Sequence, residues 1–226
     1  MTDKTDLSYV HGHRARLREK FVETRLVDYE LLELLLSYAI PRCDVKPIVK
    51  SLLAKFGGMH QTLNAPIDEL EKIVGISNNT AIFLKALREV SLREYQKTMS
   101  EKPLLCNNDL IANYCRMLLG DKTTEEIHVL YLNAKQQLIE DECHSRGTTN
   151  WSAVHPREII KRALNLDATS IILMHNHPGG SQNFSDDDKL ITKALDKMCR
   201  SVDIALSDHL MIAGSKIISA KGLFII

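Results

Sequence analysis

The chain has 226 residues, of which 44% are hydrophobic and 26% charged, and its formal net charge is zero. This length and composition are typical of a globular protein with one large domain or two modest ones. The charge is also even along the chain: the first 98 residues carry 15 Lys and Arg against 13 Asp and Glu, and the rest carries 14 against 16. A protein that grips DNA through its phosphates normally has a basic surface, so the composition argues against strong binding of that kind.

No apolar run approaches the roughly 20 residues that are needed to span a bilayer, and no membrane partner is expected. The first six residues lack the apolar core of a signal peptide, so we expect a cytoplasmic protein. The five cysteines are an odd number, widely scattered, and contain no Cys-x-x-Cys pair. They predict neither a disulfide framework nor a thiolate zinc site, and most are expected to be buried, reduced thiols. They are Cys43, Cys106, Cys115, Cys143 and Cys199.

The first part of the chain, from about Leu7 to Tyr95, has a helical pattern. The nearly all-round apolar stretch 31–36 predicts a buried helix that stops at Ile40-Pro41, where proline forbids continuation. A further helix is expected over 48–56, ended by Gly57-Gly58. The local basic stretch Arg14-Ala-Arg-Leu-Arg-Glu-Lys20 is expected to be a solvated helix face.

Residues 67–84 combine a helix, a short hydrophobic-Gly-hydrophobic turn at Gly75, and a second helix, and so resemble a helix-hairpin-helix unit. In the DNA-binding versions the turn usually reads Gly-Ile-Gly, which lets backbone amides approach a phosphate. Here the second glycine is replaced by Ser77. Helix packing and phosphate contact explain Gly75 equally well. We therefore expect residues 1–98 to form a small all-α domain that binds duplex DNA weakly or not at all.

The helical pattern lapses between Gln96 and Asn108, which predicts a linker. Strands then alternate with helices, which predicts an α/β domain with a mixed sheet over residues 104–226. The expected strands are 127–132, 138–145, 168–174 and 204–212, with a final hairpin in 217–226, and the expected helices are 156–166 and 185–200.

The most informative motif of the chain follows the third expected strand. His175 and His177 alternate, so on an extended segment both imidazoles point the same way. Ser185 and Asp188 follow at the start of a helix, where Ser185 is also a suitable N-cap. Two neutral imidazoles and one carboxylate are donors that zinc accepts, and three protein ligands leave a fourth position open, as in catalytic sites. The pattern predicts one zinc ion per chain, held by His175, His177 and Asp188.

This pattern resembles the JAMM signature of JAB/MPN metalloprotease-type domains, in which His-x-His is followed by seven residues, a serine, two residues and an aspartate. The whole chain, with its helical first part and the segments Arg146-Gly-Thr and His155-Pro-Arg-Glu, is similar to bacterial RadC-type proteins. The common Pro-Ser-Gly is Pro178-Gly-Gly here, and Phe184 replaces the usual proline, but neither change touches a ligand. The resemblance implies a cytidine-deaminase-like mixed sheet flanked by helices, and metal-dependent hydrolysis of a peptide or isopeptide bond.

The family also has a glutamate just before the first strand, which implies Glu126 as the catalytic acid–base group, with Glu125 as the competitor. A slip of one residue reverses which face of a strand a side chain occupies, so only one of them can face the site. Glu126 would move the proton of the attacking water, and Ser185 would donate to the developing oxyanion. His128, two residues after Glu126, is expected to face the pocket as a bystander. His209 could support a ligand imidazole or belong to a buried core pair.

Three functions remain open from the sequence. The first is a zinc hydrolase that acts on an unidentified protein or peptide. The second is a DNA-associated repair or accessory protein, which the family's traditional link to DNA repair suggests. The third is a metal-binding scaffold without turnover, although such a scaffold needs neither the glutamate nor Ser185.

Overall fold

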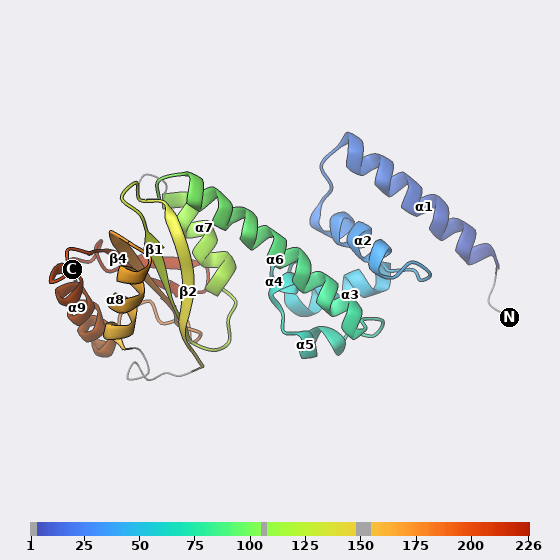
Figure 1. The fold of residues 1–226 in the computed structure, drawn as a ribbon. Coiled ribbons are helices and arrows are strands. Elements are labelled where there is room, and N and C mark those ends of the chain that lie inside the picture. Colours follow the sequence, from blue (N-terminus) through green and yellow to red (C-terminus); the bar gives the residue numbers. More distant parts are fainter. Residues whose placement is uncertain (1–3, 105–107, 148–154) are drawn as a thin grey trace. The chain divides into compact units, whose positions relative to one another are not determined.

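A computed structural model of the chain describes residues 4–104, 108–147 and 155–226. The chain divides into two compact units, Met1–Val90 and Ser91–Ile226. The first unit is helical, and the second contains a five-stranded sheet with helices on its faces (Figure 1). The predicted fold class, a mixed α/β domain preceded by helices, is therefore confirmed.

The first unit is built from helices around a main apolar core, and Leu17, Leu26 and Leu34 form a smaller separate cluster. Leu32, Leu52, Leu70 and Leu84, which come from different helices, are fully buried in this core. The predicted helix ends are confirmed, since Gly57 ends its helix with a left-handed φ of 90°. The helices are α1 (Lys4–Glu23), α2 (Asp28–Ala39), α3 (Lys46–Phe56), α4 (Met59–Asn64), α5 (Ile67–Glu71) and the first part of α6 (Asn78–Glu101).

Arg14, at the start of the basic stretch, is buried rather than solvated. Its guanidinium donates hydrogen bonds to the carbonyls of Ile40 (3.0 Å), Cys43 (2.5 Å) and Pro41. The last carbonyls of a helix have no partner within it, and α2 ends next to Ile40. Arg14 therefore gives hydrogen-bond donors to the carbonyls at and just after the end of α2. The expectation of a solvated face is wrong for this residue.

The turn between α5 and α6 is explained by packing. Gly75 has a φ of +94°, and a Cβ atom there would lie 2.7 Å from Cδ1 of the buried Ile48. Ser77 accepts a hydrogen bond from the Thr80 backbone at 3.4 Å, at the start of α6. Both the glycine and the serine therefore have a structural reason within the unit.

Helix α6 continues to Glu101, so the linker predicted from Gln96 is helical over its first six residues. Met99, in this part of α6, is fully buried in the core of the second unit together with Leu92. The sequence pattern missed this because one buried residue in a polar stretch gives no visible periodicity. The predicted domain bounds, 1–98 and 104–226, stay a prediction.

The second unit holds the sheet, whose order is β2-β1-β3-β4-β5. Only the β3–β4 pair is parallel. The last strand pairs with β4, so the hairpin expected within 217–226 is wrong, and the helix α7 was not predicted. The elements are α7 (Asn108–Leu119), β1 (Glu126–Leu132), β2 (Leu138–Arg146), α8 (Pro156–Asn165), β3 (Ser170–Asn176), α9 (Asp186–Arg200), β4 (Ala205–Ala213) and β5 (Lys216–Ser219).

Both faces of the central strands are covered by helices, so adjacent residues of β1 and β3 belong to different cores. Leu130 and Met174 pack in the core that contains the buried residues of α7, and we call this side the α7 face. Val129 and Leu173 pack with the buried residues of α8 and α9, and we call this side the α8/α9 face. The alternation of a strand therefore decides on which face each polar side chain of β1 and β3 lies.

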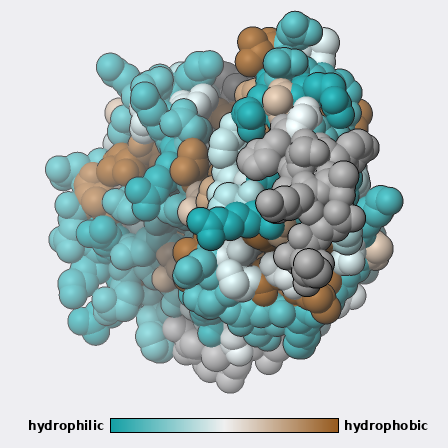
Figure 2. All heavy atoms as spheres, turned by 90° about the vertical axis from the view of Figure 1, so that its right-hand side faces the viewer, coloured by the Kyte–Doolittle hydropathy of each residue, from teal (hydrophilic) through white to brown (hydrophobic). Residues whose placement is uncertain are grey.

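No helix among residues 4–104, 108–147 and 155–226 is long and apolar enough to cross a membrane. Figure 2 shows one face of the molecule, on which hydrophilic residues predominate and hydrophobic residues form small separate groups. This distribution is expected when most apolar side chains pack into the cores described above.

Candidate metal centre

His175 and His177 lie at the end of β3. His175 is two residues beyond Leu173, on the α8/α9 face, and its antiparallel partner on β1 is Ile127. The His177 backbone donates to the Ile212 carbonyl at 2.8 Å, which keeps the chain extended one residue past the strand. Because the chain is extended here, both imidazoles project to the same side of the sheet.

Asp188 reaches the same place from the first turn of α9. Ser185 is the N-cap of this helix: its hydroxyl oxygen accepts from the Asp188 backbone at 3.1 Å, and its own backbone N–H donates to Asp188 Oδ2 at 2.6 Å. The predicted N-cap is therefore confirmed. Asp188 is fully buried, and its Oδ1 atom has no hydrogen-bond partner within residues 4–104, 108–147 and 155–226. A buried carboxylate oxygen without a partner is costly unless it is given a cation or a donor.

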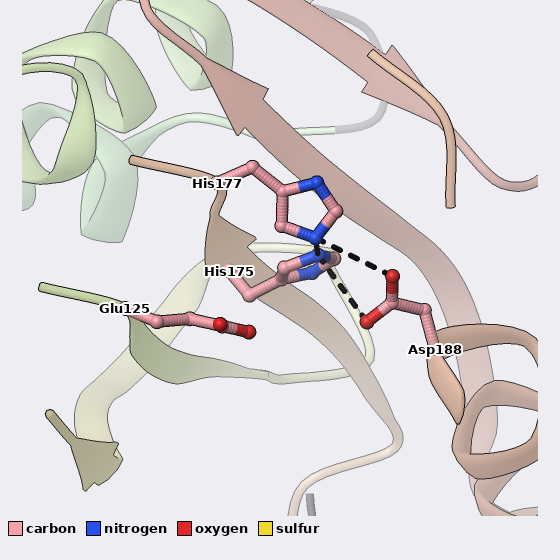
Figure 3. Close-up of side chains that lie close together, drawn as sticks. All are labelled: Glu125, His175, His177 and Asp188. Atoms are coloured by element: carbon pink, nitrogen blue, oxygen red, sulfur yellow. Dashed lines mark hydrogen bonds and ion pairs between the residues drawn. The ribbon is translucent and has the colours of Figure 1, made fainter. Parts of the chain in front are cut away.

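The two imidazoles and the Asp188 carboxylate face one another (Figure 3). The Nε2 atoms of His175 and His177 are 3.0 Å apart. His175 Nε2 lies 3.5 Å from Asp188 Oδ1, and His177 Nε2 lies 3.4 Å from Asp188 Oδ2. Glu125 completes the group, since the four residues each offer a ligand atom within 4.8 Å of the others.

Hydrogen bonds behind the site fix the tautomer of His175. The Thr192 hydroxyl donates to the Asp188 carbonyl at 2.5 Å, so its oxygen accepts from His209 Nδ1–H at 2.6 Å. His209 Nε2 is then an acceptor, and His175 Nδ1–H donates to it at 2.7 Å. The lone pair of His175 Nε2 consequently points into the cluster. His209 thus contacts the ligand imidazole, one of its two expected roles.

His177 has the same tautomer for a simpler reason. Its Nδ1 lies 3.2 Å from the Ser181 carbonyl, which can only accept, so Nδ1 carries the proton and Nε2 the lone pair. Burial also lowers the pKa of His175 to about 3 and holds the pKa of His209 well below its ordinary value. Phe184, which stands where the family usually has proline, covers the His175 and His209 rings at centroid distances of 5.8 and 5.0 Å. The imidazoles of His175 and His209 are therefore held neutral, as a histidine must be to bind a metal.

The structure brings Glu125 to the histidines and leaves Glu126 away from them. Ile127 pairs with His175 and shares its face, so Glu125, two residues earlier, points to the α8/α9 face and Glu126 to the α7 face. Glu126 Oε1 contacts Lys122 at 2.9 Å and Arg146 at 3.3 Å. Its neighbour His128 is also on the α7 face, so the expectation that either residue faces the pocket is wrong.

The electrostatics of the two glutamates differ accordingly. Burial raises the pKa of the Glu125 carboxyl above its ordinary value. Burial would raise the pKa of Glu126 as well, but His128, Lys122 and Arg146 outweigh it and lower that pKa to about 2. A carboxylate that acts as a base needs a pKa nearer neutrality, which favours Glu125 in this role.

A pocket of about 720 Å³ opens beside the cluster. Glu125, His177 and Ser185 all line it, so the serine expected at the site is present at its edge. The Ser185 oxygen accepts a hydrogen bond in the helix cap, so its hydroxyl proton is available to donate to another group. The pocket is large enough for a few residues of a bound peptide chain.

The residues present fit a divalent cation. Two imidazole lone pairs and a buried carboxylate oxygen without a partner converge from β3 and α9, and these are zinc-type donors. The sequence predicted these three side chains, but it gave no sign of Thr192, and it favoured Glu126 where the structure places Glu125 beside the histidines. The register of β1 with β3 decides which glutamate lies beside the histidines, and this register cannot be predicted from the sequence of one strand alone.

The comparisons with known proteins agree with this geometry. A family model described as the RadC-like JAB domain matches residues 105–223. The chain is also 38% identical over 211 residues to a UPF0758 protein of Ruegeria pomeroyi, covering 92% of this chain and 94% of that protein. A match to more than half of the chain, together with a relative of this identity along nearly its whole length, shows that the chain belongs to the RadC family of JAB-domain proteins.

Proposed function

We propose that the protein is a zinc-dependent hydrolase that cleaves peptide or isopeptide amide bonds. The observation that carries this proposal is the convergence of two imidazoles, one buried carboxylate and a second, protonatable carboxylate beside a pocket. A scaffold that only binds a metal needs the first three groups but has no use for the fourth. The proposed substrate is a protein or peptide.

In this proposal His175, His177 and Asp188 would hold the ion. Bound zinc would lower the pKa of a water molecule and polarise the substrate carbonyl. Glu125, revised from Glu126, would take the proton of the attacking water and deliver it to the leaving amine. Its raised pKa suits the first half of this transfer, because a more basic carboxylate takes a proton from water more readily.

Ser185 would stabilise the developing oxyanion. Its oxygen is already engaged by the Asp188 backbone, so the hydroxyl proton can be donated into the pocket that Ser185 lines. The helix cap holds the side chain in one rotamer, which is the preorganisation that such a donor needs.

The experiment is a comparison of Glu125→Gln with Glu126→Gln in the full chain, at saturating zinc, against a library of peptide and isopeptide substrates. Glu125→Gln should lose about 10²–10⁴-fold in kcat/KM, as expected on removal of a general acid–base group, while it keeps its fold. Glu126→Gln should lose much less, because its side chain lies on the α7 face.

Two results would contradict the proposal. Equal activity of the wild type and Glu125→Gln would remove the acid–base role. A collapse of activity in Glu126→Gln alone would return that role to the residue first implied by the family pattern.

A further inference from the structure

A second group of metal-ligand side chains lies on the α7 face of the sheet. It consists of Glu126 and His128 on β1 and Cys143 on β2, and we call it the α7-face cluster. His128 and Cys143 are register partners on neighbouring antiparallel strands. The three residues each offer a ligand atom, and these atoms lie within 4.8 Å of one another.

His128 is the central residue of the cluster. It is 6% exposed, and among the residues that the structure describes its buried Nε2 atom has no hydrogen-bond partner. Glu126 Oε2 lies 3.5 Å from this nitrogen, which is too far for a good hydrogen bond. A buried nitrogen in this position is expected to have a partner, and an ion between the three side chains would supply one.

The other ring nitrogen of His128, Nδ1, contacts a carboxylate, as is common for histidines that bind metals. Its Nδ1 atom lies 2.9 Å from Asp141 Oδ1. Asp141 in turn accepts from the Tyr114 hydroxyl, which accepts from Gln96 at 2.9 Å. A histidine that binds a metal commonly donates its second N–H to a carboxylate, which fixes the ring and aims the other nitrogen at the ion.

The other two donors are suitably prepared. Lys122 and Arg146 both contact Oε1 of Glu126, so Oε2 remains turned toward His128. Cys143 is exposed at the sheet surface, and its thiol contacts the Ser145 carbonyl at 3.4 Å. The thiolate is the form of cysteine that binds metals.

We propose that Glu126, His128 and Cys143 form a second divalent-metal site, with zinc-type cysteine, imidazole and carboxylate donors and an open fourth position. The site lies on the opposite face of β1 from the cluster around His175, and it does not depend on the proposed hydrolase activity. It also revises the expectation that the scattered cysteines bind no metal, because Cys143 meets its partners across strands and not along the sequence.

Binding must displace a proton. Burial opposes a charge on His128, but Asp141, Cys143 and Glu126 outweigh it and raise its pKa to about 11.

Cobalt(II) can report this site separately from the first. A thiolate ligand gives a near-ultraviolet charge-transfer band with cobalt, whereas imidazole and carboxylate ligands do not. The full chain, kept reduced and titrated with cobalt beyond one equivalent, should develop this band. Cys143→Ser should abolish it and should lower the bound zinc by about one equivalent per chain.

Two further variants complete the design. His128→Gln should also lose the band, with far-ultraviolet circular dichroism as the check that it is folded. Cys43→Ser is the matched control, because Cys43 is also exposed but lies in the first unit, and it should keep the band. Absence of the band in the wild type at saturating cobalt, or its persistence in Cys143→Ser, would overturn the proposal and leave a charged His128 network without an ion.

Discussion

Gly57 and Gly75 have nearly the same left-handed backbone but different surroundings. Their φ angles are +90° and +94°. A Cβ atom at residue 57 would meet nothing within 4 Å, whereas at residue 75 it would lie 2.7 Å from Ile48 Cδ1. Ile48 is 5% exposed, so its packed neighbours limit how far it can move.

We therefore expect Gly75→Ala to destabilise the first unit more than Gly57→Ala. The left-handed conformation costs an alanine about 1–2 kcal/mol at either position. Crowding against Ile48 should add roughly 1–3 kcal/mol at residue 75 only. Urea unfolding of both variants measures the difference. Equal losses would mean that Ile48 moves aside freely, and that packing is not what requires the glycine.

At the level of single residues, the sequence predicted what is local and missed what depends on pairing. His175, His177, Ser185 and Asp188 follow one another in a short stretch, so their spacing was enough. Choosing between Glu125 and Glu126 required the partner of Ile127 on β3, since a strand alone does not say which face is which.

At the level of elements, α6 belongs to both units. Its second part carries Leu92 and Met99, which are 5% and 0% exposed in the core of the second unit. A fragment that begins at residue 104, the predicted domain start, lacks both side chains. The core of that fragment would be exposed to solvent where Leu92 and Met99 of α6 pack in the full chain.

The expected result is that fragment 91–226 has a clearly higher Tm than fragment 104–226. Loss of each buried Leu or Met side chain typically costs about 2–5 kcal/mol, and two are lost here. Thermal unfolding followed by circular dichroism makes the comparison. If the two fragments melted together, the end of α6 would be dispensable and the predicted domain start would stand.

Elements with strong local signals were predicted within a few residues. Proline at the start of α8, the capping residues of α9 and the glycine end of α3 are such signals. The end of α6 and the pairing of β5 with β4 were not predicted, because both depend on contacts with distant parts of the chain. Residues near a helix end often indicate where the helix stops, but no local residue pattern indicates which strand will pair with another.

At the level of the whole molecule, each unit has its own core, and both described metal-ligand clusters lie in the second. Calorimetry of the zinc-loaded protein should therefore show two transitions, of which only one responds to a chelator. An ion at a hundredfold excess over its Kd stabilises the folded state by about 2.7 kcal/mol. Removal of zinc should lower the Tm of the second unit, with the first transition as internal control.

A shift of both transitions by the same amount would show that ion binding is coupled to the stability of both units, against this prediction. No shift in either would show that the ion binds the unfolded chain as tightly as the folded one, or does not bind.

The three side chains proposed to hold the ion all come from residues 175–188, whereas Glu125 and His209 come from distant strands. Closing so short a loop costs little conformational entropy. An emerging polypeptide can thus gather His175, His177 and Asp188 around an ion before any sheet exists. Glu125 arrives only when β1 pairs with β3, and His209 only when β4 joins. A hydrolase of the proposed kind would therefore have no hydrolytic activity during synthesis until its last strands have joined the sheet.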